Sequence, residues 1–260
     1  MDTHAPLLAA TPRRRVWIVL PAYDEEAGLP KVLAAAREAM EEARLPYRVV
    51  VVDDGSSDRT TEVARAAAGR MPLTLIRHPV NLGLGATLRD GLLRACEEAR
   101  PHDVIVTLDA DDSQSPETIP RLVGRVREGW DVVVASRFRE DSQVRGVPWT
   151  RRFLSWGASW LFRLLYPIPG IRDYTCGFRA YRAAVLQDAV AAHGTALFDQ
   201  TGFQSMVDVL LRLGRRHDLV FGEVPFVLRY DRKHGASKMQ VARTVRDSLL
   251  LLAKRRLGSR

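Results

Sequence analysis

Three carboxylates lie within four residues at Asp109, Asp111 and Asp112, directly after the apolar segment 104–108. A short run of β-branched and apolar residues predicts a buried strand. Clustered carboxylates repel one another and require a compensating cation, and ligands bind beyond the carboxyl ends of strands in open α/β sheets. Oxygen ligands at such a place suit Mg²⁺ or Mn²⁺ that carries a substrate phosphate. The alternative is a solvated acidic turn before a helix that starts at 115–117.

Two further polar segments follow strand-like segments in the same way. The residues PAYDE at 21–25 follow the first apolar run, and DDGSSDRT at 53–60 follow the second. Asp58 is best explained as a cap of the next helix. Asp53 and Asp54, at the tip of the strand, are less well explained by capping. Their carboxylates can accept hydrogen bonds from the N–H groups of a base or from ribose hydroxyls.

Strand-like and helix-like patterns alternate along the first half of the chain, and these elements must position the polar segments. Strands are predicted at 16–20, 48–52, 73–77, 104–108 and 132–135. Helices are predicted at 27–43, 58–68, 84–99 and 116–128. Such alternation is typical of βαβ units, which form a mostly parallel sheet with helices on both faces. The predicted fold class is therefore α/β, with the polar segments gathered at one edge of the sheet.

The pattern changes after Ser136. Aromatic and apolar residues recur at helical spacing between 149 and 164, and this stripe is either core or, given the flanking arginines, a contact with a membrane surface. A strand at 178–181, helices at 183–191 and 202–213, a strand pair within 219–228 and a basic amphipathic helix at 241–256 are predicted to follow. We expect a flexible N-terminus at 1–15, one domain at 16–240 and a basic amphipathic extension at 241–260.

The 260-residue chain has 39 basic and 31 acidic residues, which gives a net charge of +8. The positive charge is unevenly distributed, because nine arginines and three acidic residues lie between 137 and 182. This distribution favours an anionic partner such as a nucleotide phosphate or a lipid surface. Nucleic acid is disfavoured because aromatic residues are not interleaved with the basic ones. Cys96 and Cys176 have no paired spacing, which argues against zinc or disulfides and fits a reducing cytosol. No apolar stretch approaches the ~20 residues of a membrane span, so we expect a soluble or peripheral protein.

The order and spacing of these motifs resemble those of the family 2 glycosyltransferases with the Rossmann-like GT-A fold. The resemblance rests on PAYDE, VVDDGSSDRT, NLGLG at 81–85 and LDADDSQSPE at 108–117, and on ASR at 135–137, DYTCGFR at 173–179 and GASK at 235–238 after Arg229. It covers about residues 16–240, and within the family it is similar to the dolichyl- and polyprenyl-phosphate mannosyltransferases. Asp24 stands where Asn is usual and Cys176 where Ser is frequent; neither departure removes an essential charge.

The resemblance implies roles for individual residues. It places a nucleotide-sugar against Pro21, Tyr23, Glu25, Asp53, Asn81 and Asp109, with Arg229 and Lys238 on a mobile basic loop that closes over the phosphates. It assigns the divalent metal, Mg²⁺ or Mn²⁺, to Asp109, Asp111 and Ser113. It assigns the acceptor phosphate to Arg137, Arg151 and Ser155, and the expected catalytic residues are Asp109, Asp111, Arg137 and Asp173.

The resemblance also implies the reaction, an inverting transfer of a sugar from a nucleotide-sugar, with mannose from GDP-mannose as the first candidate. The acceptor would be a polyprenyl or dolichyl phosphate at the cytoplasmic face of a membrane, to which the protein binds peripherally. Such an acceptor is already anionic, so the protein need only position it and neutralise charge.

The alternative is transfer of glucose or N-acetylglucosamine from a UDP-sugar to a lipid phosphate or to a saccharide hydroxyl. A hydroxyl acceptor needs a general base, for which Asp173 is the candidate. With a lipid phosphate as acceptor, Asp173 instead orients the arginines.

Overall fold

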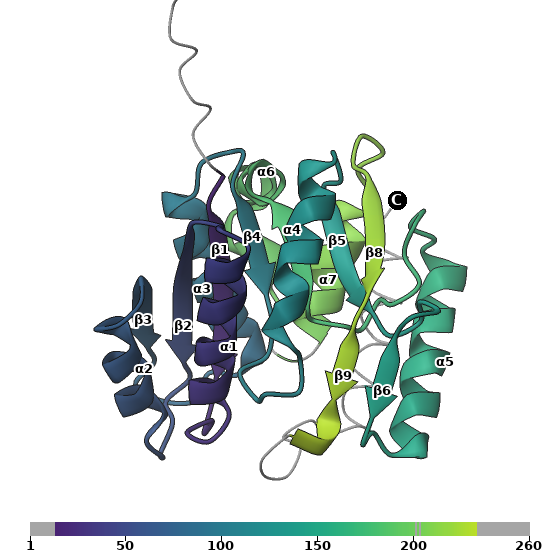
Figure 1. Cartoon of the computed structure of the whole chain (residues 1–260). Coiled ribbons are helices and arrows are strands. Elements are labelled where there is room, and N and C mark those ends of the chain that lie inside the picture. The colour runs from purple at the N-terminus through teal and green to yellow at the C-terminus, as the bar shows by residue number, and fades with distance from the viewer. Residues whose placement is uncertain (1–13, 201, 203, 233–260) are drawn as a thin grey trace, which may run out of the picture.

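The computed structural model describes residues 14–200, 202 and 204–232. Its main sheet contains β1 (Val16–Ala22), β2 (Tyr47–Asp53), β3 (Leu73–Arg77), β4 (Val104–Thr107), β5 (Val132–Ser136), β7 (Arg179–Arg182) and β8 (Phe221–Pro225). The strand order is β3-β2-β1-β4-β7-β5-β8 (Figure 1). All neighbours are parallel except that β7 runs antiparallel to β4 and to β5. The predicted α/β class with a mostly parallel sheet is confirmed.

Helices cover both faces of this sheet (Figure 1). One face carries α1 (Leu29–Glu42), α2 (Thr60–Ala68) and α4 (Ile119–Arg127), which η1 (Pro116–Thr118) precedes. The other carries α3 (Leu84–Glu98), α6 (Ala183–His193) and α7 (Gln204–Leu213), with η2 (Gly194–Phe198) between the last two. The apolar runs of β1, β2, β4 and β5 are fully buried, as expected of strands covered on both faces.

A smaller unit lies beyond the main sheet. β6 (Gln143–Arg145) and β9 (Val227–Arg229) pair in parallel, η3 (Tyr230–Arg232) follows β9, and α5 (Trp149–Leu165) lies on the side of β8 (Figure 1). The strand pair predicted within 219–228 is wrong as a pair, because β8 joins β5 while β9 joins β6. Phe226 lies between the two strands, and its carbonyl accepts from the N–H of Gln143, the first residue of β6, at 3.2 Å.

The direction of β7 matters most for the site. Because β7 is antiparallel, its first residue, Arg179, pairs with Thr107 of β4 and Val134 of β5 near their carboxyl ends. The segment before β7 therefore reaches the edge at which the parallel strands end. The Thr107 hydroxyl ties this segment down by donating to the Gly177 carbonyl at 2.7 Å. The DYTCGF motif is thereby placed among the strand-end motifs.

Several expectations fall on residues outside the described ranges: most of the N-terminal segment 1–15, Lys238 and the C-terminal helix at 241–256. The predicted domain limit at 240 lies there as well. Among the helices in the described part of the chain, none is long and apolar enough to cross a membrane.

Candidate active site

The loops that follow β1 and β2 are joined by hydrogen bonds. The Asp24 N–H donates to Ser56 Oγ at 2.9 Å, and Asp24 Oδ1 accepts from the N–H of Ser57 at 2.8 Å. One residue further on, the Glu25 N–H donates to Thr60 Oγ1 at 2.7 Å. The motif side chains of the first loop are half-buried at this junction: Pro21, Tyr23 and Glu25. The two segments predicted to hold a nucleotide thus form one surface.

Asp53, predicted to contact the nucleotide, is fully buried at the end of β2. Its Oδ1 accepts from the N–H of Ser56 at 3.0 Å, and its Oδ2 accepts from the Thr61 hydroxyl. Arg77 approaches Oδ2 at 4.0 Å. Asp53 therefore fixes the loop that follows it, a role that the sequence argument did not assign.

Asp54 anchors the loop that carries Asn81. Its Oδ1 accepts from the N–H of Leu82 at 2.9 Å and lies 2.7 Å from His78 Nδ1, and its Oδ2 accepts from the N–H of Gly83 at 2.8 Å. The other ring nitrogen, His78 Nε2, lies 3.0 Å from Asp90 Oδ2. Asn81 itself is exposed at the rim of the site. The network holds a predicted donor-binding residue in place.

The acidic run forms an ordered loop after β4. Asp111 is buried, and its Oδ1 accepts from the N–H of Ser113 at 3.0 Å and from the Ser113 hydroxyl at 2.6 Å. Asp109 is held by Gln114, whose Oε1 accepts from the Asp109 N–H at 3.0 Å and whose Nε2 donates to Asp109 Oδ2 at 2.7 Å. Gln114 is a site residue that sequence reasoning missed, although it lies within the LDADDSQSPE motif.

The start of α1 braces the same loop from the side. Gly28 packs so closely that a Cβ added there would lie 2.7 Å from the Ala110 carbonyl oxygen and 3.0 Å from Asp111 Cα. Real side chains do not tolerate such a contact with backbone atoms. The position of the acidic loop therefore depends on the packing of the loop after β1.

The chemistry of these side chains fits a metal that arrives with the nucleotide. Among the described residues, no three His, Cys, Asp or Glu side chains form a group that could hold a metal ion alone. Mg²⁺ commonly binds through one or two carboxylates and completes its shell with substrate phosphates and water. Asp109, Asp111 and the Ser113 hydroxyl supply oxygen donors of that kind.

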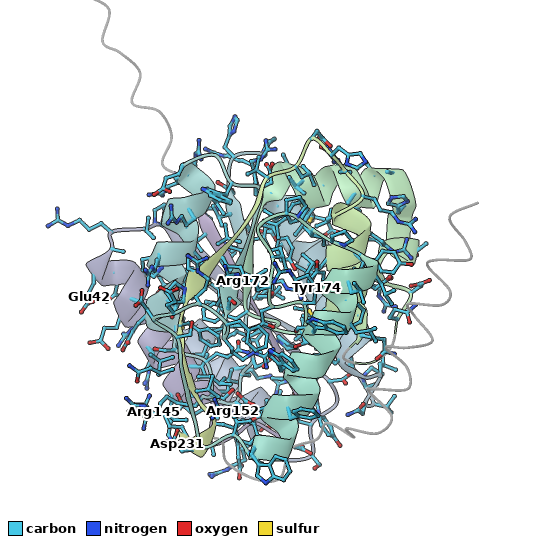
Figure 2. The ribbon with its side chains drawn as sticks, turned by 90° about the vertical axis from the view of Figure 1, so that its right-hand side faces the viewer. Glu42, Arg145, Arg152, Arg172, Tyr174 and Asp231 are labelled. Carbon is cyan, nitrogen blue, oxygen red and sulfur yellow. The ribbon has the colours of Figure 1, made fainter. Side chains whose placement is uncertain are left out.

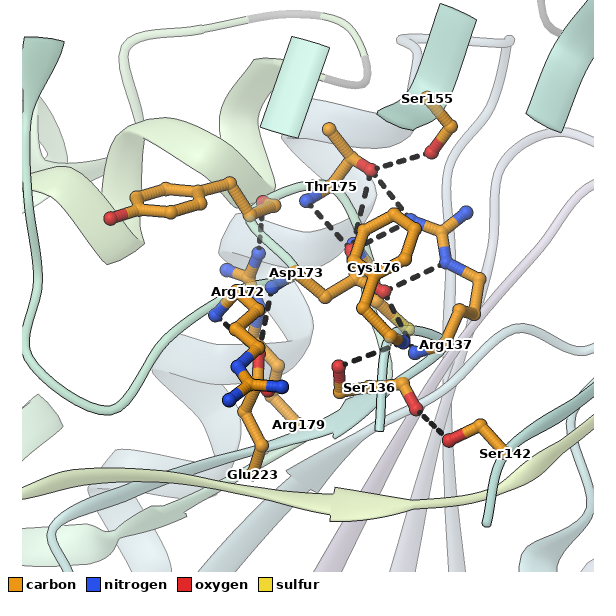
Figure 3. Close-up of polar contacts among 12 residues, drawn as sticks. Ser136, Arg137, Ser142, Ser155, Arg172, Asp173, Thr175, Cys176, Arg179 and Glu223 are labelled. Atoms are coloured by element: carbon orange, nitrogen blue, oxygen red, sulfur yellow. Dashed lines mark hydrogen bonds and ion pairs between the residues drawn. The ribbon is translucent and has the colours of Figure 1, made fainter. Parts of the chain in front are cut away.

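A second polar cluster lies across the edge, around Arg137 and Asp173 (Figure 3). Arg137 Nε donates to Asp173 Oδ2 at 2.8 Å and its Nη2 donates to Oδ1 at 2.7 Å, which makes a bidentate pair. Asp173 also accepts from the backbone N–H groups of Arg137 at 3.0 Å and of Cys176 at 3.1 Å. The Asp173 side chain is fully buried, whereas that of Arg137 is 19% exposed.

The charges of this cluster stabilise one another. Burial alone would raise the pKa of Asp173, but Arg137 and the backbone N–H groups hold that pKa below its ordinary value. Burial also opposes the charge of Arg137, yet Asp173 and, more weakly, Asp109 raise the pKa of Arg137. Burial and the nearby Asp173 raise the pKa of Cys176 to about 12, so its thiol stays protonated. The cluster presents one arginine cation close to the acidic loop.

Glu223 on β8 supports the cluster from below and was not predicted. Its Oε1 accepts from the N–H of Arg172 at 2.6 Å and from the N–H of Asp173 at 2.7 Å (Figure 3). Burial raises the pKa of Glu223. By fixing the backbone at 172–173, Glu223 aims the Asp173 carboxylate at Arg137.

The remaining predicted residues lie around this cluster. Ser155 of α5 is half-buried, with its Oγ 3.1 Å from Thr175 Oγ1, while the side chain of Arg151 lies outside the described part of the structure. The Arg229 N–H donates to the Ser113 carbonyl at 2.8 Å, and its guanidinium pairs with Asp231 at 2.8 Å. Figure 2 shows Asp231 at the lower end of the molecule, the end at which β9 terminates in Figure 1.

Comparison with known proteins defines the class. The model of glycosyl transferase family 2 matches residues 17–189. The chain is 32% identical over 227 residues to dolichol-phosphate mannosyltransferase of Pyrococcus furiosus, covering 87% of this chain and 59% of that protein. It is 34% identical over 226 residues to undecaprenyl-phosphate mannosyltransferase of Micrococcus luteus, covering 86% of this chain and 87% of that protein. This chain belongs to glycosyl transferase family 2, as the motifs suggested.

The fold is shared with solved structures. Glucosyl-3-phosphoglycerate synthase from Mycobacterium tuberculosis, in complex with Mn²⁺, UDP and glucosyl-3-phosphoglycerate, matches with a TM-score of 0.65 at 23% identity. The match covers 92% of this chain and 80% of that one. It supports the GT-A architecture inferred from the sequence.

Proposed function

We propose that this chain transfers a sugar with inversion from a nucleotide-sugar to a polyprenyl phosphate at a membrane surface, with mannose from GDP-mannose as the first candidate. The observation that carries the proposal is the Arg137–Asp173 pair beside the acidic loop. An arginine whose charge is secured by a buried carboxylate is suited to bind a phosphate, and Arg137 is close enough to Asp109 of the acidic loop for the two charges to interact. The names of the two relatives, a dolichol-phosphate and an undecaprenyl-phosphate mannosyltransferase, support transfer of mannose to a polyprenyl phosphate.

A divalent metal, Mg²⁺ or Mn²⁺, would bind through Asp109, Asp111 and Ser113 and neutralise charge on the leaving diphosphate. The loops around Tyr23 and Asn81 would hold the nucleoside. Arg137 and Ser155 would orient the acceptor phosphate, whose own oxygen is the nucleophile. Lys238 and Arg151 complete the proposed set of phosphate ligands, as the sequence resemblance implies.

The geometry of Asp173 argues against a saccharide hydroxyl as acceptor. A general base must reach the hydroxyl proton and be able to accept it near neutral pH. Asp173 is fully buried, its two oxygens accept from Arg137 and from backbone N–H groups, and its pKa is depressed. Asp173 is therefore suited to orient Arg137, which fits an acceptor that is already anionic.

The test is a donor screen with undecaprenyl phosphate in detergent and Mn²⁺. GDP-mannose, UDP-glucose and UDP-N-acetylglucosamine are incubated separately, and lipid-linked sugar is measured after extraction. We expect lipid-linked product from one of the donors, and GDP-mannose is the first candidate. We expect no product when undecaprenol replaces undecaprenyl phosphate as the acceptor. The absence of product from every donor would refute the proposal, and product from undecaprenol would favour the hydroxyl-acceptor alternative.

The outer face of α5 supports action at a membrane surface. Five large apolar side chains recur along it at helical spacing with exposed fractions between 55% and 78%: Trp149, Phe153, Trp156, Trp160 and Leu164. Exposed Arg152 and Arg163 flank the stripe. Aromatic side chains with neighbouring arginines suit the boundary of an anionic bilayer. Both cysteines are buried and free, which fits the cytoplasmic face that we propose.

We expect the double substitution Trp156→Ser and Trp160→Ser to weaken binding to phosphatidylglycerol vesicles about a hundredfold, because each tryptophan would contribute about 1.5 kcal/mol of apolar burial. Vesicle sedimentation gives the measurement. Val220→Ser, which changes an exposed apolar residue just before β8, is the control and should bind as the parent protein does. Equal binding of the double variant would contradict a role for α5 at the membrane.

A further inference from the structure

The Thr175 hydroxyl lies at the centre of the Arg137 cluster (Figure 3). Its Oγ1 lies 2.6 Å from Arg137 Nη2, 3.1 Å from Ser155 Oγ and 3.4 Å from Asp173 Oδ1. Thr175 thus contacts both described residues assigned to the acceptor phosphate, although no motif argument gave it a role. It also joins the loop before β7 to helix α5.

One of these hydrogen bonds has a fixed direction. A guanidinium can only donate, so Thr175 Oγ1 accepts from Arg137 Nη2. The Thr175 hydroxyl has two acceptors in reach for its own proton, Asp173 Oδ1 at 3.4 Å and Ser155 Oγ at 3.1 Å, and in the second pair either hydroxyl can be the donor. In both arrangements Thr175 links Arg137 to Ser155.

The hydrogen bonds join three segments that are distant in sequence. Arg137 follows β5, Thr175 precedes β7 and Ser155 lies on α5, and Thr175 Oγ1 contacts the other two side chains. Ser155 is half-buried and lies on the flank of α5 away from the exposed tryptophans. The relative position of the Ser155 hydroxyl and the Arg137 guanidinium is therefore set by Thr175.

We propose that Thr175 is a positioning residue that holds the Ser155 hydroxyl and the Arg137 guanidinium in place relative to each other, so that together they bind the phosphate of the lipid acceptor. This inference rests on the proposed function and deepens it. It also couples the seating of α5 to the geometry of the phosphate site.

The test compares Thr175→Val, which keeps the shape and removes the hydroxyl, with Thr175→Ser, which keeps the hydroxyl. With undecaprenyl phosphate and the donor found in the screen, Thr175→Val should raise the acceptor KM about 10- to 100-fold, the range for hydrogen bonds that involve charged groups. Its donor KM should not change. Thr175→Ser should stay within about twofold of the parent. Equal KM values for Thr175→Val and the parent, or an equal loss in Thr175→Ser, would overturn the inference.

A matched control separates this effect from a loosened loop. Thr107→Val removes the hydroxyl that donates to Gly177 in the same loop but contacts neither Arg137 nor Ser155. It should lower the midpoint of thermal unfolding and leave the acceptor KM unchanged. An acceptor KM raised equally by Thr107→Val would assign the effect to loop order and overturn the inference. If Thr175→Val does not fold, Thr175→Ala is read by the same criteria.

Two further variants separate this inference from the proposed function. If Arg137→Ala leaves the acceptor KM unchanged, the proposed phosphate site itself fails. If Arg137→Ala raises the acceptor KM and Thr175→Val does not, only the role of Thr175 fails. Because Thr175 acts through Ser155, the double variant Thr175→Val and Ser155→Ala should lose no more than the worse single variant. Multiplying losses would contradict the hydrogen-bonded chain.

Discussion

Asp111→Asn is expected to lower kcat/KM for sugar transfer about 100- to 1000-fold, the usual scale for removing one group that stabilises developing charge. The substitution is nearly isosteric, and its Oδ1 can still accept from the N–H and hydroxyl of Ser113, so the fold should persist. What it removes is a negative charge at the predicted metal position. Rates measured against Mn²⁺ concentration should show a weaker dependence on metal, and thermal unfolding should show an unchanged midpoint.

Asp112→Asn is the matched control, because it makes the same change one residue away. Asp112 is partly exposed and has a φ of +61°, a conformation that asparagine adopts readily. It should transfer sugar at nearly the parental rate. If Asp111→Asn is as active as Asp112→Asn, the acidic run is only a turn before η1, and the metal assignment fails.

Asp173→Ala is expected to have the largest effect on stability, a loss of about 3–5 kcal/mol, as is typical when one partner of a buried ion pair is removed. The change leaves the Arg137 guanidinium without its counter-ion and deprives three backbone N–H groups, those of Arg137, Thr175 and Cys176, of their acceptor. Urea unfolding followed by circular dichroism gives the measurement. A loss below about 1 kcal/mol would show that the pair behaves as an exposed one.

Asp218→Ala is the corresponding control on the surface. Arg216 Nη2 lies 2.7 Å from Asp218 Oδ2, the same distance as in the buried pair, but both side chains are exposed. Solvent screens such a pair, so its removal should leave the unfolding midpoint unchanged. The comparison isolates burial as the cause of the predicted loss.

The pH dependence of the unfolding free energy should also report the contribution of the buried Asp173–Arg137 pair. The pKa of Asp173 is lower in the folded protein than the ordinary 3.8, so its contribution is present above that value and is lost as pH falls through the folded pKa. The parent protein should therefore lose stability as the pH falls below about 4, because carboxylates become protonated there. Asp173→Ala should lose less over that range, because it has already lost this contribution.

The placement of the strand-end motifs could be predicted from sequence because it depends on local patterns. Apolar β-branched runs mark buried strands, and in βαβ units successive strands end at the same edge. Asp109, Asp53 and Tyr23 could be assigned to one edge on that basis alone. β3 begins and ends at the predicted residues, and the other strands of the main sheet are within a few residues of their predicted limits, whereas β6 was not predicted.

What the sequence did not reveal depends on contacts between distant segments. No periodicity tells that β7 runs antiparallel between β4 and β5, yet this direction brings Asp173 to the site. The supporting role of Glu223 depends on its pairing position opposite Val134. Asp53 was predicted to contact the nucleotide; its additional role as an anchor follows only from the folded geometry, because its partner Thr61 is the second residue of α2.

The strand order divides the main sheet into two blocks, each continuous in sequence. β1 to β4 carry the loops that we propose to hold the donor, and β5, β7 and β8 carry the cluster that we propose to hold the acceptor phosphate. Within the described residues, the pairing of β4 with β7 joins the two blocks of this sheet. A change of register in one block need not disturb hydrogen bonds within the other. Under the proposed function, the block that binds the acceptor can diverge in evolution while the block that binds the nucleotide is kept, and the acidic loop after β4 must continue to fit both.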